Sequence, residues 1–431
     1  MSFPLDISAI FRAGRSLIAG AVIAKIASLL LIPVIARIYL PEDFSELALF
    51  TAILVLIGPL LTLRYSQALV VPRSDVMLAN LVALCLTIGI AISLLSGFVT
   101  LLYFLLREEK GGNFAPYMPL VIVASTLPAL FYEILSSLAI RDRKYTLFAQ
   151  TQASQAVFGS LAKVGLGLLG ATGHGLIIGH VISQFSGVRP LLRSYWHWWL
   201  ARRNLVTRRN MRLAGRAFWQ FPAFRLPSQL LLAFAAQSPT MFVVWRYVGN
   251  QSGQFALAMS LVTIGTNLVG ASLGRAFLGE AGEIYRNERH RIARYTIKMQ
   301  VVFSIIFAPF ALFSYFTAES LLSFVLGPNW SLAAKIAPTL ILYGIAQVCA
   351  APVIQVLTFM NHQVAFLFIN AARLVSVFIL FAVTVRGNLD MIAFTELYSM
   401  VMISFYLFVA ISVFALLLSK TQNLTQGRND N

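Results

Sequence analysis

Long apolar runs, separated by short polar breaks, follow one another along almost the whole chain of 431 residues. Each run is close to the ~20 residues that an α-helix needs to cross the hydrocarbon core of a bilayer. Such segments must be helical, because lipid offers no hydrogen-bond partner to free backbone groups. The pattern predicts an all-α polytopic membrane protein. Its twelve expected spans cover residues 16–36, 44–63, 78–106, 117–140, 147–170, 174–192, 220–245, 252–273, 297–318, 334–358, 363–385 and 390–418.

The composition excludes a water-soluble globule of this size. Hydrophobic residues make up 58% of the chain and charged residues only 11%, whereas about 25% of the residues of an average soluble protein are charged. A membrane β-barrel is also excluded, because barrel strands alternate in polarity and these runs are unbroken. Cys85 and Cys349 lie inside apolar runs and the five histidines are scattered, so we expect neither a disulfide nor a metal site.

The charge distribution predicts the orientation in the membrane. Of the 33 Lys and Arg residues, 23 fall in alternate breaks that share one side, six fall on the other side and four fall within spans. The positive-inside rule then places both termini in the cytoplasm. The net charge of +17 is read as this topology signal and as attraction to anionic membrane lipids, not to nucleic acid. Eight arginines and three tryptophans between Arg189 and Arg216 suit a segment that lies at the lipid interface.

The same basic stretch divides the chain into two halves of six spans. We expect an N-terminal bundle at residues 1–192, a cytoplasmic linker at 193–219 and a C-terminal bundle at 220–431. A shift of 208 residues superimposes Tyr39 on Tyr247, each just after the first span of its half, and Lys163 and Arg373 lie 210 residues apart. Transporters built from two such halves bind substrate between them near mid-membrane. We therefore expect two six-helix bundles around a central cavity.

Basic side chains inside the spans predict an anionic substrate, such as a phosphate or diphosphate. A charge at mid-membrane is costly, so it usually faces a watery cavity. Lys25 lies near the middle of the first span, and Arg225 lies in the first span of the second half. Ser228 and Gln229 follow Arg225 at helical spacing and share its face. Together with Arg373 in the eleventh span, these residues are the candidate substrate-binding set.

Two further intramembrane charges have alternative interpretations. Lys163 either faces the cavity or extends its amine to the outer surface. Glu133, in the fourth span, either pairs with a base as a structural bridge or carries a proton for an ion-coupled cycle. No Walker A motif occurs, so no nucleotide cofactor is expected and an ion gradient is a candidate energy source. Gly165-Leu-Gly167-Leu-Leu-Gly170 matches a dinucleotide fingerprint but lies inside a span, where small residues usually serve helix packing.

Five segments of the chain carry a further signal: Ala36–Leu49, Leu63–Arg73, Gln220–Ser228, Val325–Ser331 and Ala350–Ile354. Together they resemble the Wzx-like polysaccharide flippases of the multidrug/oligosaccharidyl-lipid/polysaccharide exporter superfamily. The resemblance runs over nearly the whole chain, in the order and spacing of that family.

The resemblance implies a protein that moves polyprenyl-diphosphate-linked glycans across the cytoplasmic membrane of a bacterium, with no enzymatic activity. It also implies a polysaccharide polymerase and chain-length proteins as partners, and a cytoplasmic gate at Arg64. Two positions depart from the pattern: Ser45 replaces an expected glycine, and Ser66 replaces an expected glutamate, which removes an acid beside Arg64. One alternative is a multidrug/cation antiporter of the same superfamily, which would favour an acidic cavity. A second is a sibling that flips a peptidoglycan precursor, which would be expected to carry extra spans. A third is a membrane-embedded polymerase, which would need a large outer loop.

Overall fold

The computed structural model describes residues 28–106, 117–247, 249–287, 292–359 and 363–426. Within these ranges the chain is almost entirely helical and contains no strand. A helix over Ser28–Ile38 precedes the others. The remaining long helices are α2 (Pro41–Leu61), α3 (Asp75–Leu106), α4 (Met118–Arg141), α5 (Tyr145–Leu168), α6 (Thr172–Arg202), α7 (Arg208–Ala217), α8 (Leu226–Arg246), α9 (Asn250–Asn287), α10 (Ile292–Leu326), α11 (Ser331–Phe359), α12 (Gln363–Arg386) and α13 (Met391–Gln426).

The helices overlap the predicted spans, and several extend beyond them; α9, for example, ends at Asn287 and not at residue 273. Eleven spans coincide with α2 to α6 and α8 to α13, and the first span is described only from Ser28 onward. Seven helices in the described ranges are long and apolar enough to cross a membrane, namely α2, α3, α4, α10, α11, α12 and α13. The other four long helices carry more polar side chains; α5, for example, has Gln150, Gln152 and Gln155 within two turns.

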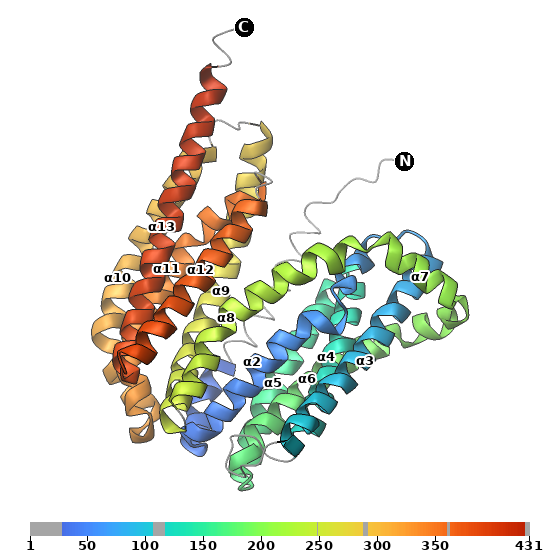
Figure 1. Ribbon diagram of the computed structural model, residues 1–431, viewed down its shortest axis with the longest axis horizontal. Coiled ribbons are helices and arrows are strands. Elements are labelled where there is room, and N and C mark those ends of the chain that lie inside the picture. Colours follow the sequence, from blue (N-terminus) through green and yellow to red (C-terminus); the bar gives the residue numbers. More distant parts are fainter. Residues whose placement is uncertain (1–27, 107–116, 248, 288–291, 360–362, 427–431) are drawn as a thin grey trace. The chain divides into compact units, whose positions relative to one another are not determined.

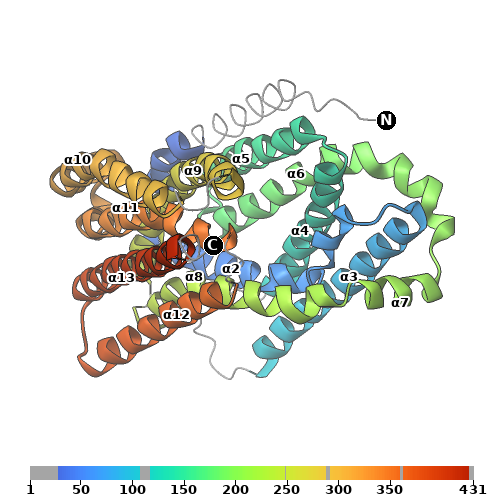
Figure 2. The ribbon, with the colours of Figure 1, turned by 90° about the horizontal axis from the view of Figure 1, so that it is seen from above.

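The chain forms two compact units, Met1–Gln237 and Ser238–Asn431, whose boundary falls within α8. The sequence-based boundary at residues 193–219 stays a prediction. In the first unit, α2 to α6 run side by side (Figures 1 and 2). In the second unit, α11 packs against α9, α10 and α13.

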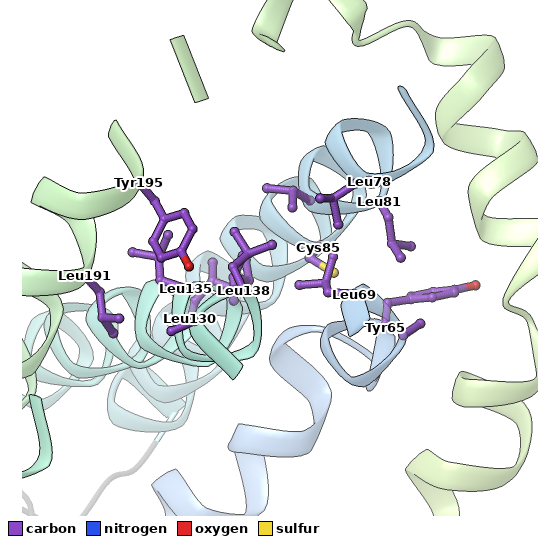
Figure 3. Close-up of a cluster of buried hydrophobic side chains, with 14 of the residues drawn as sticks. Tyr65, Leu69, Leu78, Leu81, Cys85, Leu130, Leu135, Leu138, Leu191 and Tyr195 are labelled. Atoms are coloured by element: carbon purple, nitrogen blue, oxygen red, sulfur yellow. The ribbon is translucent and has the colours of Figure 1, made fainter. Parts of the chain in front are cut away.

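An apolar cluster joins α3, α4 and α6 of the first unit (Figure 3). Its α3 side chains include Leu78, Leu81 and Cys85, and its α4 side chains include Leu130, Ile134 and Leu138. The spacing of three and four residues places each set on one helix face. The cluster also receives Tyr65 from η1 (Tyr65–Val70), a short 3₁₀ turn between α2 and α3. The turn is therefore anchored in the core.

The expected linker is itself helical. The sixth span was predicted to end at residue 192, but α6 continues to Arg202 and is followed by η2 (Arg203–Leu205) and α7. Asn80 of α3 is fully buried; its side chain donates to Leu205 O at 3.0 Å and accepts from Thr207 N at 3.0 Å. Burial raises the pKa of Tyr65 above its ordinary value, so its hydroxyl stays a neutral donor to Gly215 O of α7, 3.1 Å away. These contacts pack the linker onto the first unit.

In each half of the chain, a tyrosine just after the first helix forms a hydrogen bond with a later part of the same half. The hydroxyl of Tyr39 donates to Lys163 O of α5 at 2.8 Å. The hydroxyl of Tyr247 donates to Leu389 O, in the turn between α12 and α13, at 2.7 Å. Both side chains are buried. The repeat that pairs Tyr39 with Tyr247 in the sequence thus has a counterpart in their contacts.

Candidate functional site

A cavity of about 330 Å³ opens among α2, α4 and the part of α8 that belongs to the first unit. Most of its wall is apolar or small, and its polar lining comes from Arg64, Glu133 and Gln229. The complete lining is Val55, Gly58, Pro59, Arg64, Glu133, Gln229, Leu232, Ala233 and Ala236. The cavity lies beside two spans, so these polar groups meet a largely apolar environment.

The backbone after α2 directs Arg64 toward this cavity. Leu63 and Arg64 both adopt the left-handed region, with φ of 45° and 63°. Residues other than glycine rarely adopt this conformation, which costs roughly 1–3 kcal/mol per residue unless the surroundings enforce it. Here the Tyr65 side chain, buried in the apolar cluster, and the ion pair of Arg64 hold the turn from both sides. The local strain serves to position one charged side chain.

Glu133, on α4, receives several donors on a single oxygen. Arg64 Nη1 lies 3.4 Å from Glu133 Oε1. The hydroxyls of Ser66 and Thr62 donate to the same oxygen at 2.6 and 3.2 Å. A carboxylate can accept about four hydrogen bonds over its two oxygens. The known contacts therefore leave acceptor capacity at Oε2.

Arg64 also bridges to α8, because its Nη2 donates to Gln229 Oε1 at 3.0 Å. One guanidinium thus connects the end of α2, α4 and the beginning of α8. Its Nε is buried without a hydrogen-bond partner, while the side chains of Arg64 and Glu133 remain 18% and 22% exposed. The pair is neutral overall and accessible to small molecules. An anion that entered the cavity could take over donors that now serve Glu133 and Gln229.

The structure brings together three of the predicted site residues and separates the others. Glu133, Gln229 and Arg64 meet, as described above. Arg225 ends a π-helical turn, Phe221–Arg225, just before α8, and its side chain is exposed outside this cavity. Ser228 is exposed and donates to Phe224 O of its own turn.

The remaining predicted residues lie elsewhere. Lys163 of α5 packs against Gly179 of α6 and does not line the cavity. Arg373 belongs to the second unit, on α12. Lys25 lies outside the described residues.

Sequence reasoning missed Thr62 and Ser66. The departure at Ser66 removed an acid next to Arg64 in the sequence, but Glu133 supplies an acid in space and Ser66 hydrogen-bonds it. The sequence does hold one signal for them. Their hydroxyl side chains lie two residues before and two residues after Arg64, at the polar end of a span. Their partner, Glu133, lies 71 residues after Thr62 and 67 residues after Ser66, a separation that local pattern does not reveal.

The chain resembles a known protein family in its sequence. The sequence matches the model of a family described as polysaccharide biosynthesis proteins over residues 34–335. No curated sequence matches it at a significant level.

The fold is similar to those of solved transporters. One is an inward-facing multidrug resistance MATE family transporter of the MOP superfamily (12% identity, 92% of this chain and 94% of that chain covered, TM-score 0.68). Another is MATE in complex with MaL6 (13% identity, 95% and 97% covered, TM-score 0.59). A third is an outward-facing transporter of that superfamily (14% identity, 95% and 94% covered, TM-score 0.52). At these identities the likeness concerns the fold alone, and it confirms the predicted all-α polytopic class with about twelve helices.

Proposed function

The chain belongs to the family of polysaccharide biosynthesis proteins, and we propose that it moves polyprenyl-diphosphate-linked oligosaccharide repeat units from the inner to the outer leaflet. The products would feed a surface or secreted polysaccharide, such as an O-antigen or exopolysaccharide. Two helical bundles would expose a central cavity alternately to each side of the membrane.

The observation that carries the proposal is the Arg64–Glu133–Gln229 cluster in an otherwise apolar cavity wall. Sugar hydroxyls and a diphosphate lose their water on entering ~30 Å of hydrocarbon. The polar groups of the cluster would replace that water. The guanidinium binds phosphate and the carboxylate binds sugar hydroxyls, while the amide can bind either phosphate or sugar hydroxyls. The polyprenyl chain is apolar and would remain in the bilayer.

The energy source in this proposal is an ion gradient, the membrane potential or consumption of the product. Glu133 is the candidate for coupling, because it is an intramembrane acid that already holds the side chain of Arg64. Protonation of Glu133 would weaken that ion pair and release donors toward the cavity.

A multidrug/cation antiporter is the second candidate, favoured by the fold likeness to multidrug transporters. An antiporter of cationic drugs needs a free acid in its cavity, whereas Glu133 is paired with Arg64. A membrane-embedded polymerase would need a substantial outer domain, and the breaks between the described outer helix ends are short.

The proposed setting is the cytoplasmic membrane of a bacterium, with both termini in the cytoplasm. The 23-to-6 distribution of Lys and Arg supports this orientation. The basic α6–α7 region would contact anionic lipids, and a polymerase and chain-length proteins would receive the product on the other side.

The test is the sidedness of the lipid-linked repeat unit in spheroplasts, probed with an impermeant glycan-modifying enzyme. We expect the unit to be modified in cells with the wild-type protein and protected in cells that lack it. Arg64→Gln should behave like the deletion. Arg73→Gln is the matched control, since Arg73 is exposed on the same polar segment and should leave the unit accessible. Full exposure of the repeat unit without the protein would contradict the proposal.

A further inference from the structure

Arg373 lies inside the second unit, surrounded by tyrosines. It occupies the middle of α12, and its Nη2 donates to the hydroxyl of Tyr343 on α11 at 3.5 Å. Tyr398 and Tyr406 of α13 also lie close enough to the guanidinium to interact with it electrostatically. The Tyr343 ring centroid is 5.4 Å from that of Tyr398 and 6.3 Å from that of Tyr406. All three tyrosines are at most 5% exposed.

The hydrogen-bonding capacity of this tyrosine cage is incompletely used. Arg373 Nε and the hydroxyl of Tyr398 are both buried and have no hydrogen-bond partner of acceptable geometry. Buried polar groups are satisfied in the great majority of cases, so two such atoms in one cluster call for an additional partner. Arg373 Nε can only donate, whereas the Tyr398 hydroxyl can donate or accept. A ligand oxygen that accepts hydrogen bonds would satisfy both atoms at once.

The charge of Arg373 is also uncompensated in the described part of the chain. None of the ion pairs found there includes Arg373. Arg64 differs, because Glu133 offsets its charge. Arg373 is partly exposed, but its Nε is buried. A charge that is largely removed from water and has no counter-ion is unfavourable, and neutral phenol hydroxyls offset only part of that cost. A ligand that accepts hydrogen bonds and carries negative charge meets both requirements.

We propose that Arg373, Tyr343, Tyr398 and Tyr406 form a binding site for an anionic oxygen group, either a carboxylate or a phosphate. The site deepens the proposed function, on which it rests for the source of that group: an acidic sugar of the glycan or the diphosphate of the carrier lipid. The planar guanidinium fork fits both groups with two parallel hydrogen bonds, and the phenol hydroxyls supply further donors. An acidic glycan sugar would make Arg373 a determinant of substrate choice.

The test is anion binding by the full-length protein in nanodiscs, measured by calorimetry with pyrophosphate, glucuronate and glucose. We expect the wild-type protein to bind at least one of the two anions and not to bind glucose. Binding of glucuronate assigns the site to an acidic sugar, and binding of pyrophosphate alone assigns it to the carrier lipid. Arg373→Gln should weaken binding about tenfold or more, the loss expected for a charge-assisted hydrogen bond.

Matched variants keep this test decisive. Arg386→Gln removes an exposed arginine from the end of the same helix and should leave anion binding unchanged. Arg373→Lys keeps the charge but loses the fork, so it should bind more weakly than wild type even if Arg373→Gln does not fold. Equal binding by wild type and the folded Arg373 variants, or no anion binding by wild type, overturns the site. Neither result affects the sidedness assay of the wild-type protein, so failure of the site and failure of the proposed function remain distinguishable.

Discussion

The guanidinium of Arg64 and the carboxylate of Glu133 lie 3.4 Å apart, although 69 residues separate them in the sequence. The pair connects the strained turn after α2 to the middle of α4. It neutralises the only two formal charges in the lining of the first-unit cavity described here. The cavity is therefore polar without net charge until one of the partners is protonated, displaced or removed.

Removal of the acid alone should destabilise the protein. Glu133→Gln leaves Arg64 with an uncompensated, largely buried charge, so we expect a loss of about 1–3 kcal/mol in the free energy of unfolding. The double variant Arg64→Gln/Glu133→Gln should recover much of that loss, because no lone charge remains. Thermal denaturation in detergent measures both. Asp75→Asn, which breaks the more exposed Arg202–Asp75 pair, should cost at most about 1 kcal/mol. Additive effects of the Arg64 and Glu133 substitutions would contradict the coupling.

Charge reversal at the first helix of either half should stop transport without unfolding the protein. Arg225 is exposed, so Arg225→Glu removes no buried contact, yet it repels an anionic head group. Lys25→Glu should act in the same way. Arg216→Glu, also exposed but on α7, is the control and should transport normally. The measurement is exposure of the repeat unit in spheroplasts. Normal exposure in both reversed variants would refute the idea of a cationic path.

The glycine motif in α5 should respond as a helix-packing motif. A methyl group at Gly167 would overlap the side chains of Ile38 and Tyr39, whereas the position of a methyl at Gly165 has no neighbour within 4 Å. We expect Gly167→Ala to lower stability by about 1–3 kcal/mol. Gly165→Ala should be neutral or slightly stabilising, because alanine favours the helix. Melting temperatures compare the two directly, and equal effects would rule out this assignment.

Asn80 should control the order of the segment between α6 and α7. Asn80→Ala removes the bonds to Leu205 O and Thr207 N and so frees the segment between α6 and α7. Limited trypsin digestion should then cut faster at Arg203. Asn204→Ala, an exposed neighbour, should leave the rate unchanged. Identical digestion of both variants would show that the clamp is not needed.

The helices themselves were predictable, because hydrophobic run length reports directly on membrane spans. The runs at residues 78–106 and 363–385 correspond to α3 and α12 within a few residues. The end of α6 was not predictable in this way. Residues 193–202 are polar enough to leave the membrane, yet their helix continues because Tyr195 is buried and bonds to Asp142.

The candidate site was only partly predictable for a similar reason. Glu133 was found because a charged side chain inside an apolar run stands out, and Gln229 because it lies at helical spacing from Arg225. Their contact with Arg64 depends on the backbone turn at Leu63 and Arg64, where no glycine signals a positive φ. The tyrosine cage around Arg373 draws on three helices, so its members are unremarkable in the sequence. Contacts between residues that lie far apart in the chain leave no local pattern in the sequence.

The most direct test of the central claim is flipping of a polyprenyl-diphosphate-linked oligosaccharide in proteoliposomes that contain only this protein. The glycan exposed on the outer surface is measured with an impermeant modifying enzyme, with an imposed ion gradient and without one. We predict that wild-type protein brings inner-leaflet glycan to the accessible side and that Arg64→Gln, inserted to the same level, does not. Wild-type liposomes that expose no more glycan than protein-free liposomes under either condition would contradict the account.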